Sequence, residues 1–392
     1  MKRMCYFDNI IVILSIIASG TVVFSFQHRN KFMLLYFIVS LVYFRKKISM
    51  NHLKKEGFLK LIIILALVSL NCLINYNNKI YWGETFRFIA YIIITYMNLC
   101  CISFSQYKKL FVRVMVVFAA ISLIVFSCVH LGIFKVKVKV IYDMIYHISY
   151  FHVVGTYIVT TRNSGLFWEP GMYQVFLNLA LLFRLDGIFK SEYTKNKSRF
   201  DIIILIIAII STKSTTGYIV MIVILITFLL KYNFNIRKKV GIVLIKCLMI
   251  IAAIFIVITV LNSNVVSNKF DKDNYSFRAR ENHIVSSIKL IHDRPIIGYG
   301  IRSDKYIQEY TLQTGRNAVN SMGVFVMVLY LGIPFTVLYY CFIYTQIKKR
   351  KFAFNNLIIF LIIIIFHSTE VFYVCPIASL FILDYAEEKE TV

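Results

Sequence analysis

The residues with the clearest chemical potential lie in one short stretch, positions 161–171, which reads TRNSGLFWEPG. Its Arg162 could bind a phosphate or carboxylate through paired hydrogen bonds, and its Glu169 could accept a proton from a hydroxyl group. The stretch comes directly before a long apolar segment, where charged residues are costly and usually serve a function. Two roles stay open for Glu169: a general base, or an ion-pair partner of Arg162 that shapes the turn.

A second polar stretch, residues 262–320, carries two further arginines in a predicted helix. Ser276 can cap a helix over Phe277–His292, and Arg278 and Arg280 fall in its first turns. Because the start of a helix favours anions, two cations there indicate that helix and arginines bind one anion, such as a phosphate. The alternative is that both side chains are simply solvated. The buried stripe of this helix is predicted to consist of Ile284, Ile288 and Ile291.

Two further candidates for substrate binding are Arg87 and Lys213. Arg87 lies three residues after Glu84 at the start of a predicted span, where it could form a helix-end salt bridge or bind an anion. Lys213 lies in the hydroxyl-rich turn 211–217 between two short apolar segments. This turn resembles a phosphate-binding loop only loosely, because the pattern GxxxxGK[ST] is absent.

Tyr146 and Asn320 complete the set of candidate substrate-binding residues. Tyr142, Tyr146 and Tyr150 recur at four-residue spacing, which predicts one face of an amphipathic helix. That face could rest in the membrane interface or stack on a sugar beside the basic run 135–139. Asn320 ends the second polar stretch, at the mouth of the next apolar run.

The composition predicts a multi-pass helical membrane protein. Hydrophobic residues make up 59% of the 392 positions and charged residues 16%, and the apolar residues form long uninterrupted runs. The net charge of +25 does not favour a nucleic-acid partner, because the basic residues form short clusters between apolar runs, as cytoplasmic loops do. The eight cysteines include no CxxC pair, which favours packing roles over disulfides or a metal site.

Charge and hydropathy together predict twelve membrane-spanning helices in one all-α membrane domain, 1–392, with both termini in the cytoplasm. Most basic residues outside the predicted cytoplasmic clusters lie in two extracytoplasmic loops, 135–170 and 262–320, which indicates another role for them. The predicted spans cover residues 9–26, 32–44, 61–74, 85–104, 112–134, 171–185, 200–210, 217–230, 240–261, 321–345, 353–367 and 371–385.

Several motifs, taken in order, resemble those of the O-antigen polymerase and ligase superfamily. The resemblance extends from Arg162 to the end of the chain, and it depends on the order and sidedness of the motifs rather than on any one of them. The motifs are Arg162-x-x-Gly-Leu-Phe-x-Glu169-Pro-Gly before a span, the Ser214-Thr-Thr-Gly217 hairpin, Arg278-x-Arg280, and Arg294-Pro-Ile-Ile-Gly298-Tyr-Gly300 followed by an asparagine before the next span.

The resemblance implies a GT-C-like glycosyltransferase, in particular a Wzy-type polymerase of undecaprenyl-diphosphate-linked oligosaccharide repeat units. Such an enzyme works at the outer leaflet of the bacterial cytoplasmic membrane, surrounded by membrane lipid and without a metal or other cofactor. Its product is a capsular polysaccharide, exopolysaccharide or O-antigen, and a flippase and a chain-length regulator are candidate partners. Arg162, Arg278 and Arg280 would stabilise the leaving diphosphate, and Glu169 would be the base for the acceptor hydroxyl.

One departure from the superfamily pattern bears on the reaction. The ligase branch typically carries a histidine in the outer stretch before the span that corresponds to 321–345, whereas residues 316–323 contain none. This favours a polymerase over a ligase. Two rival functions stay open: a flippase or exporter of lipid-linked glycans, against which stands the lack of an internal repeat, and a scaffold or small-solute transporter. For a transporter, Glu370 near His367 is the candidate proton site.

Overall fold

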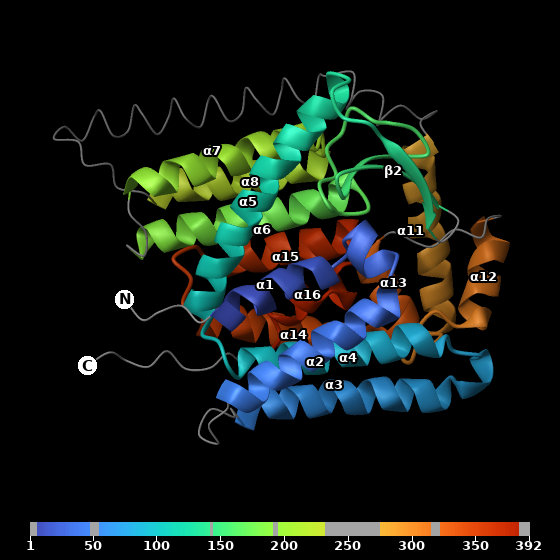
Figure 1. Cartoon of the computed structure of the whole chain (residues 1–392). Helices are drawn as coiled ribbons and strands as arrows, with labels where there is room; N and C mark the ends of the chain where they lie inside the picture. Colours follow the sequence, from blue (N-terminus) through green and yellow to red (C-terminus); the bar gives the residue numbers. More distant parts are fainter. Residues whose placement is uncertain are drawn as a thin grey trace. The chain divides into compact units, whose positions relative to one another are not determined.

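The computed structural model describes residues 6–47, 55–141, 144–190, 195–231, 275–314 and 322–383. These residues are mostly helical, with one small three-stranded sheet (Figure 1). The chain divides into two compact units, each described by itself below. Unit 1 contains residues 1–110, 278–351 and 356–392, and unit 2 contains residues 111–277 and 352–355.

Unit 1 is built from helices of both ends of the chain. Contacts of α16 with α1 and α4, and of α12 with η3, join the two parts. The N-terminal part contains α1 (Tyr6–Ala18), the π-helix η1 (Val22–Phe26), α2 (Arg29–Lys47), α3 (Lys55–Ile74), the 3-10 turn η3 (Tyr76–Asn78), α4 (Trp82–Leu99) and the start of α5 (Phe104–His130). The later part contains most of α11 (Tyr275–Asp293), α12 (Asp304–Thr314), α13 (Gly323–Leu331), α14 (Ile333–Lys349), α15 (Asn356–Thr369), the 3-10 turn η4 (Phe372–Val374) and α16 (Pro376–Ser379).

The described residues of unit 2 combine three helices with the sheet and the rest of α5. Helix α6 packs against α7 and α8, and nearly all of its residues are buried, so it forms the core of this unit (Figure 1). The sheet is antiparallel in the order β1-β2-β3. The elements that follow α5 are β1 (Lys137–Ile141), β2 (Met144–Ser149), β3 (His152–Thr156), α6 (Pro170–Phe189), α7 (Lys195–Ser211) and α8 (Thr215–Lys231).

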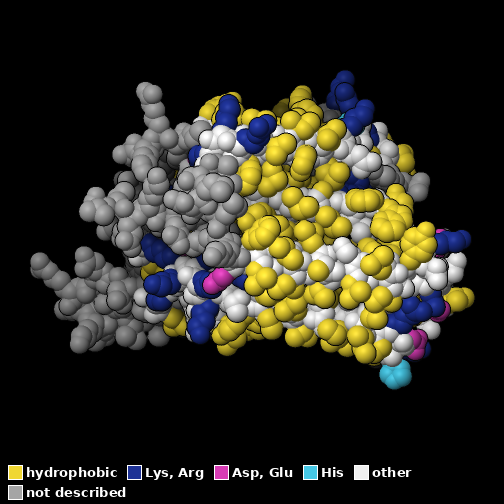
Figure 2. All heavy atoms as spheres, turned by 90° about the horizontal axis from the view of Figure 1, so that it is seen from below, with side chains coloured by type: hydrophobic (Ala, Val, Ile, Leu, Met, Phe, Trp, Pro, Cys, Tyr) yellow, Lys and Arg dark blue, Asp and Glu magenta, His cyan; other side chains and the backbone are white. Residues whose placement is uncertain are grey.

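Several helices have the length and composition of membrane spans. By these criteria 56–74, 104–130 and 170–189 are long and apolar enough to cross a bilayer among the described residues, and 6–18, 215–231 and 356–369 are shorter apolar helices. Figure 2 shows a face on which hydrophobic side chains form a broad area with Lys and Arg at its borders. Such a face suits contact with lipid, and the helices indicate a membrane protein.

The first predicted extracytoplasmic loop folds as a sheet, which corrects both the all-α prediction and the amphipathic helix expected around Tyr146. The physical reason is visible in positions 135–140, where lysine and valine alternate with a period of two residues. That period places the two residue types on opposite faces of a strand, and β-branched valine favours the extended backbone. The four-residue tyrosine spacing was therefore the weaker signal.

Three predicted spans are interrupted within the described residues, so the count of twelve stays a prediction. The span 9–26 ends as an α-helix at Ala18 and continues after Thr21 as the π-helix η1. The span 321–345 breaks between α13 and α14, and 371–385 contains only η4 and the short α16. Prolines at the start of α14 and α16 remove backbone donors at these breaks. The predicted span 240–261 lies outside the described residues.

The helix predicted after Ser276 is also corrected in detail. Helix α11 already includes Ser276, so this residue is not the cap that precedes it. The side chain of Ile288 is 56% exposed, whereas Ser286, Ser287 and Leu290 are buried. The helix therefore buries two serines and Leu290 most deeply, whereas Ile284 and Ile291 of the predicted stripe are half-buried and Ile288 is exposed. Small side chains allow a closer approach of neighbouring backbone than isoleucine would.

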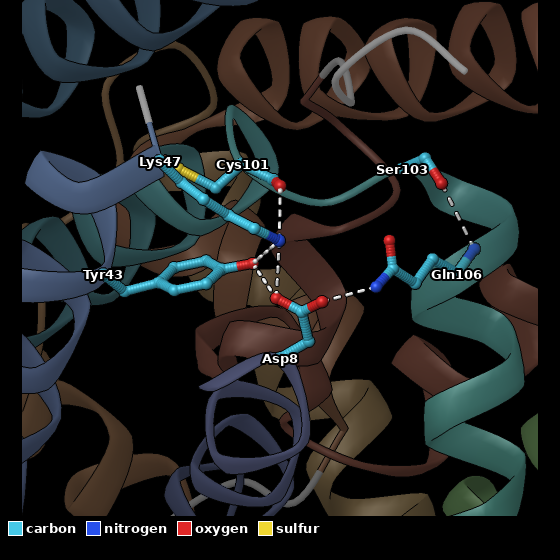
Figure 3. A network of polar contacts seen from close by, with 6 residues as sticks. All are labelled: Asp8, Tyr43, Lys47, Cys101, Ser103 and Gln106. Carbon is cyan, nitrogen blue, oxygen red and sulfur yellow. Dashed lines mark hydrogen bonds and ion pairs between the residues drawn. The ribbon is translucent and has the colours of Figure 1, made fainter. Parts of the chain in front are cut away.

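Asp8 forms a buried polar junction between α1, α2 and α5 in unit 1 (Figure 3). Its carboxylate accepts hydrogen bonds from Tyr43 Oη at 2.5 Å, from Lys47 Nζ at 2.7 Å and from the Gln106 amide. Lys47 Nζ also contacts Tyr43 Oη and the Cys101 carbonyl. Because a buried carboxylate is costly unless donors surround it, these contacts stabilise the positions of three helix ends together.

The segment 294–300 docks against the break between α13 and α14. The backbone N–H of Tyr299 donates to Leu329 O at 2.7 Å, and that of Gly300 donates to Tyr330 O at 3.1 Å. These bonds satisfy the carbonyl groups at the end of α13, which have no partner inside a helix. The segment thus completes the broken helix with its backbone.

Two glycines make this close approach possible. Gly332 has a φ of +86°, and a Cβ atom there would lie 1.9 Å from Ile296 O. Gly298 has a φ of +68°, and a Cβ atom there would lie 2.6 Å from Leu329 O. Any larger residue at either position would meet both an unfavourable backbone conformation and a backbone clash.

We expect Gly332→Ala to lower the free energy of unfolding by about 2 kcal/mol or more, because alanine strains the left-handed backbone and separates 294–300 from α13. The measurement is thermal unfolding of the purified protein in detergent. Gly83→Ala is the matched control, because a Cβ there meets only the flexible Tyr81 side chain, at 3.3 Å. Equal stability of the two variants would contradict this account of the junction.

Candidate functional site

In unit 2 the structure brings Arg162 together with the hydroxyl-rich turn that contains Lys213. The guanidinium Nε of Arg162 donates to Thr212 O at 3.3 Å, across fifty positions of sequence. Lys213 follows at once and has a φ of 47°, in the left-handed region. A non-glycine residue in that conformation is uncommon and often marks a functional turn. Two of the predicted cations therefore share one place, although their contact was not part of the sequence prediction.

Asn163 holds the Arg162 loop in this position through four hydrogen bonds. Its backbone N–H donates to Ser211 O and its Nδ2 donates to Ser211 Oγ, both at 3.0 Å. Its Oδ1 accepts from Ser122 Oγ at 3.0 Å and from Gly165 N at 2.9 Å. Asn163 is 2% exposed. One buried amide thus links α5, the end of α7 and the loop itself, a role that sequence reasoning missed.

Gly165 allows the same loop to pack tightly against α6 and the sheet. It has a φ of +56°, and a Cβ atom there would lie 2.9 Å from the ring of Tyr173. Its carbonyl accepts a hydrogen bond from Val153 N in β3 at 2.8 Å. The glycine of the motif is therefore explained by local sterics.

The hydroxyl groups of the 211–217 turn are largely occupied by the turn itself. Thr212 Oγ1 donates to Ile209 O at 2.7 Å and accepts from Ser214 N at 3.3 Å. Ser214 Oγ accepts from Gly217 N at 3.4 Å, which is the geometry of a cap at the start of α8. These side chains close α7 and start α8, so a ligand would meet the backbone and Lys213 rather than the hydroxyls.

Polar residues of α6 lie directly behind this turn. Asn178 Nδ2 donates to Gly217 O at 3.1 Å and to Gln174 Oε1 at 3.0 Å. A Cβ atom on Gly217 would lie 3.0 Å from the Gln174 side chain, so glycine is required for the approach of α8 to α6. Gln174 and Asn178 are fully buried, and Gln174 Nε2 has no partner among the described residues. The first turn of α8 therefore meets polar residues of the second and third turns of α6.

Glu169 does not form the ion pair with Arg162 that the sequence left open. It takes the position before the first residue of α6, with extended backbone, and Pro170 begins the helix. Within the described part of the chain, its half-buried carboxylate accepts a hydrogen bond from Trp168 Nε1 at 2.8 Å and contacts no cation. The carboxylate is thus oriented by a neutral donor, which leaves an oxygen for another proton donor.

Tyr146 lies in β2, opposite Lys139 of β1 and Thr156 of β3. Its side chain is buried, at 5% exposure, so it packs within unit 2 rather than presenting a stacking face. The exposed aromatic residues of this region are Tyr150, Phe151 and Tyr157, which are 65%, 55% and 56% exposed. All three have positive φ values and lie in turns or bends, so Tyr150 of the predicted helical face belongs to the turn between β2 and β3.

The remaining predicted residues belong to unit 1 or fall outside the described part. Arg87 NH2 lies 3.0 Å from Glu84 Oε1, so the predicted helix-end salt bridge is confirmed. Arg278 and Arg280 lie in α11, but their side chains are outside the described residues, as is all of Asn320. Their predicted roles stay predictions.

Two buried histidines add no positive charge at neutral pH. Burial lowers the pKa of His152 in β3, whose Nδ1 contacts Tyr150 O at 2.8 Å. Burial also lowers the pKa of His283 in α11, whose Nδ1 contacts Tyr310 Oη. Both act as neutral packing residues, so arginine and lysine supply the cations. Across the described ranges, no group of three His, Cys, Asp or Glu side chains could hold a metal ion.

The apolar helices and the cation-bearing turn define a class: a helical membrane protein in which Arg162 and Lys213 lie at the turn between α7 and α8. Comparison with protein families narrows the class. Residues 200–325 match the family described as O-antigen ligase, which supports the resemblance to the O-antigen polymerase and ligase superfamily. The match covers the end of α7, the 211–217 turn, α8, α11 and α12. No curated protein matches the chain.

We expect Asn163→Ala to destabilise the Arg162 loop by about 2 kcal/mol, because Ser122 Oγ and Gly165 N lose a buried acceptor. Hydrogen–deuterium exchange should rise in 161–171 and 211–217 while other helices keep their protection. Asn77→Ala, at an exposed position of η3, is the matched control. Unchanged exchange in both segments would show that Asn163 does not hold the loop.

Proposed function

We propose that the chain transfers glycan from a lipid diphosphate to a sugar hydroxyl, and that it thereby polymerises undecaprenyl-diphosphate-linked oligosaccharide repeat units. The observation that carries this proposal is the contact of Arg162 with the turn of Lys213, directly before the start of α8. Helix N-termini carry partial positive charge. One such terminus and two cations at one place favour an anion, and a diphosphate is the anion that this reaction releases.

The proposed step breaks the bond between the anomeric carbon and the phosphate oxygen and forms a bond from that carbon to the acceptor oxygen. Arg162 and Lys213 stabilise the negative charge that develops on the leaving diphosphate. Glu169 accepts the proton of the acceptor hydroxyl, since its carboxylate is oriented by a neutral donor and contacts no cation among the described residues. Arg278 and Arg280 remain candidate phosphate-binding residues of unit 1. In the proposed reaction these side chains stabilise the charge and accept the proton, and no metal or other cofactor takes part.

Ligase-type transfer is the second candidate, because the matched family is described as O-antigen ligase. Polymerisation is preferred because residues 316–323 contain no histidine, which the ligase branch typically has there. A flippase or exporter of the same lipid-linked glycans is the third. The ligase and the flippase differ from a polymerase in their product. A ligase attaches a glycan to a different acceptor, and a flippase forms no new glycosidic bond.

The proposal includes a location and partners. The protein would lie in the cytoplasmic membrane of a bacterium with both termini inside, and its site would open to the outer leaflet. The polymer would be a capsular polysaccharide, an exopolysaccharide or an O-antigen. A flippase would deliver the lipid-linked repeat units, and a chain-length regulator would act on the growing polymer.

In a strain deleted for this gene and complemented with variants, we expect Arg162→Ala to give only single-repeat glycan on the lipid. Loss of one charge-assisted donor to a developing anion lowers the rate by about 100-fold or more. Arg162→Lys should restore part of the ladder, because it keeps the charge but loses the forked geometry. Arg113→Ala, at an exposed position of α5, is the control. A normal long-chain ladder from Arg162→Ala would refute the assignment.

Glu169 is tested by comparing Glu169→Gln with Glu169→Ala. If the carboxylate is a general base, both variants should be inactive while the protein's amount and melting temperature in the membrane stay unchanged. Glutamine can still accept the Trp168 hydrogen bond, so a purely structural role predicts an active Gln variant and an unstable Ala variant. Glycan ladders and thermal unfolding, measured on the same membranes, separate the two roles.

A further inference from the structure

A cluster of three arginines surrounds one carboxylate in unit 1. Glu84 Oε1 lies 2.8 Å from Arg29 NH1, 3.0 Å from Arg87 NH2 and 3.2 Å from Arg302 NH1. The three come from the start of α2, the first turns of α4 and the segment between α11 and α12. Sequence analysis found only the pair of Glu84 and Arg87, because Arg302 is far away in the chain.

The charge of this cluster is not balanced by its own groups. Among the described residues that form these contacts, one carboxylate faces three guanidinium groups, so positive charge exceeds negative charge there. The neighbouring Lys79 and Asp304, joined by a backbone hydrogen bond of 3.2 Å, add one charge of each sign. The cluster also lies at the N-terminus of α4, whose dipole adds partial positive charge. One carboxylate offsets the repulsion among three arginines only in part, so a second anion would be attracted to this point.

The arginines are positioned before any ligand arrives. Arg302 has a φ of 47°, a left-handed conformation that is unfavourable for a residue with a side chain. Its guanidinium lies 5.5 Å from the ring centre of Tyr81. Arg87 is 11% exposed, and its buried Nε has no partner among the described residues. A strained backbone and an unsatisfied buried donor indicate a group that is held for a ligand.

Aromatic residues around the cluster indicate where the ligand comes from. Tyr81, Trp82 and Phe86 are 55%, 46% and 61% exposed, at the start of an apolar helix. Exposed tyrosine and tryptophan at a helix end are typical of the boundary between the hydrocarbon and the headgroups of a bilayer. An anion that reaches arginines at this depth is carried by a lipid.

We propose that Arg29, Arg87 and Arg302 form a binding site for the phosphate group of a lipid in unit 1. Two lipids have this chemistry: an isoprenoid diphosphate and an anionic phospholipid. The first source rests on the proposed function, because transfer between two lipid diphosphates requires a second place that holds phosphate. The second source is independent of it. Glu84 keeps the three guanidinium groups together and moderates their charge.

The experiment uses Trp82 as the reporter. The chain has two tryptophans, so a Trp168→Phe background leaves Trp82 alone beside the cluster. The full-length protein in nanodiscs of neutral lipid is titrated with inorganic diphosphate while Trp82 fluorescence is recorded. We expect saturable binding, weakened by about tenfold or more in Arg302→Ala and Arg87→Ala. Lys305→Ala on α12 is the control and should bind like the parent.

Glu84→Gln separates an anion site from a purely structural salt-bridge cluster. At an anion site, loss of the carboxylate removes a competing negative charge, so affinity for diphosphate should rise. Equal fluorescence responses in the parent, Arg302→Ala and Lys305→Ala variants, or no saturable response at all, would overturn the proposal. Because Arg302 is partly exposed, its variant should fold even if Arg87→Ala does not.

Two competition arms identify the lipid. Displacement of diphosphate by a short-chain isoprenoid diphosphate, but not by phosphatidylglycerol in the nanodisc, assigns the site to the lipid-linked substrate. Displacement by phosphatidylglycerol assigns it to the bilayer. Neither arm requires glycan transfer, so a failure of the proposed function would leave this binding result intact.

Discussion

The unit that carries Arg162 depends on one buried amide, that of Asn163. Polar backbone inside or beside a bilayer has no water to satisfy it, so every donor and acceptor of a loop at that depth needs a partner in the protein. Asn163 uses its backbone and both side-chain atoms to give partners to Ser122, Ser211 and Gly165. These bonds hold the loop against the end of α7, next to the turn that leads into α8. They also determine the position of Arg162, the residue directly before Asn163.

The electrostatics of unit 2 follow from this placement. Helices α6 and α8 both begin beside the loop, and their contact is maintained by Asn178 and by the lack of a side chain on Gly217. The dipole of α8 adds to the charges of Arg162 and Lys213, whereas Glu169 accepts from a tryptophan donor and contacts neither of these cations. A carboxylate that is held by a neutral donor can accept a proton.

The sequence predicted the helical membrane class and the motif segments, because long apolar runs and the order of polar motifs are local properties. Three other features needed the fold. The lysine and valine alternation before Ile141 competed with the tyrosine spacing, and the period-two signal determined the structure. The hydrogen bonds of Asn163 and the gathering of Arg29, Arg87 and Arg302 on Glu84 join residues that are far apart in sequence. A local pattern contains no information about such partners.

The break between α13 and α14 determines how segment 294–300, which contacts it, is interpreted. Nine residues of α13 rise about 14 Å, roughly half the thickness of the hydrocarbon layer, so the break at Gly332 falls well inside a span that begins at Gly323. Segment 294–300 contacts this break through its backbone, and the side chain of Ile296 in that segment is 69% exposed. A stretch that hydropathy assigns to an aqueous loop therefore packs its backbone against the interior of a predicted span, at the point where that span is broken.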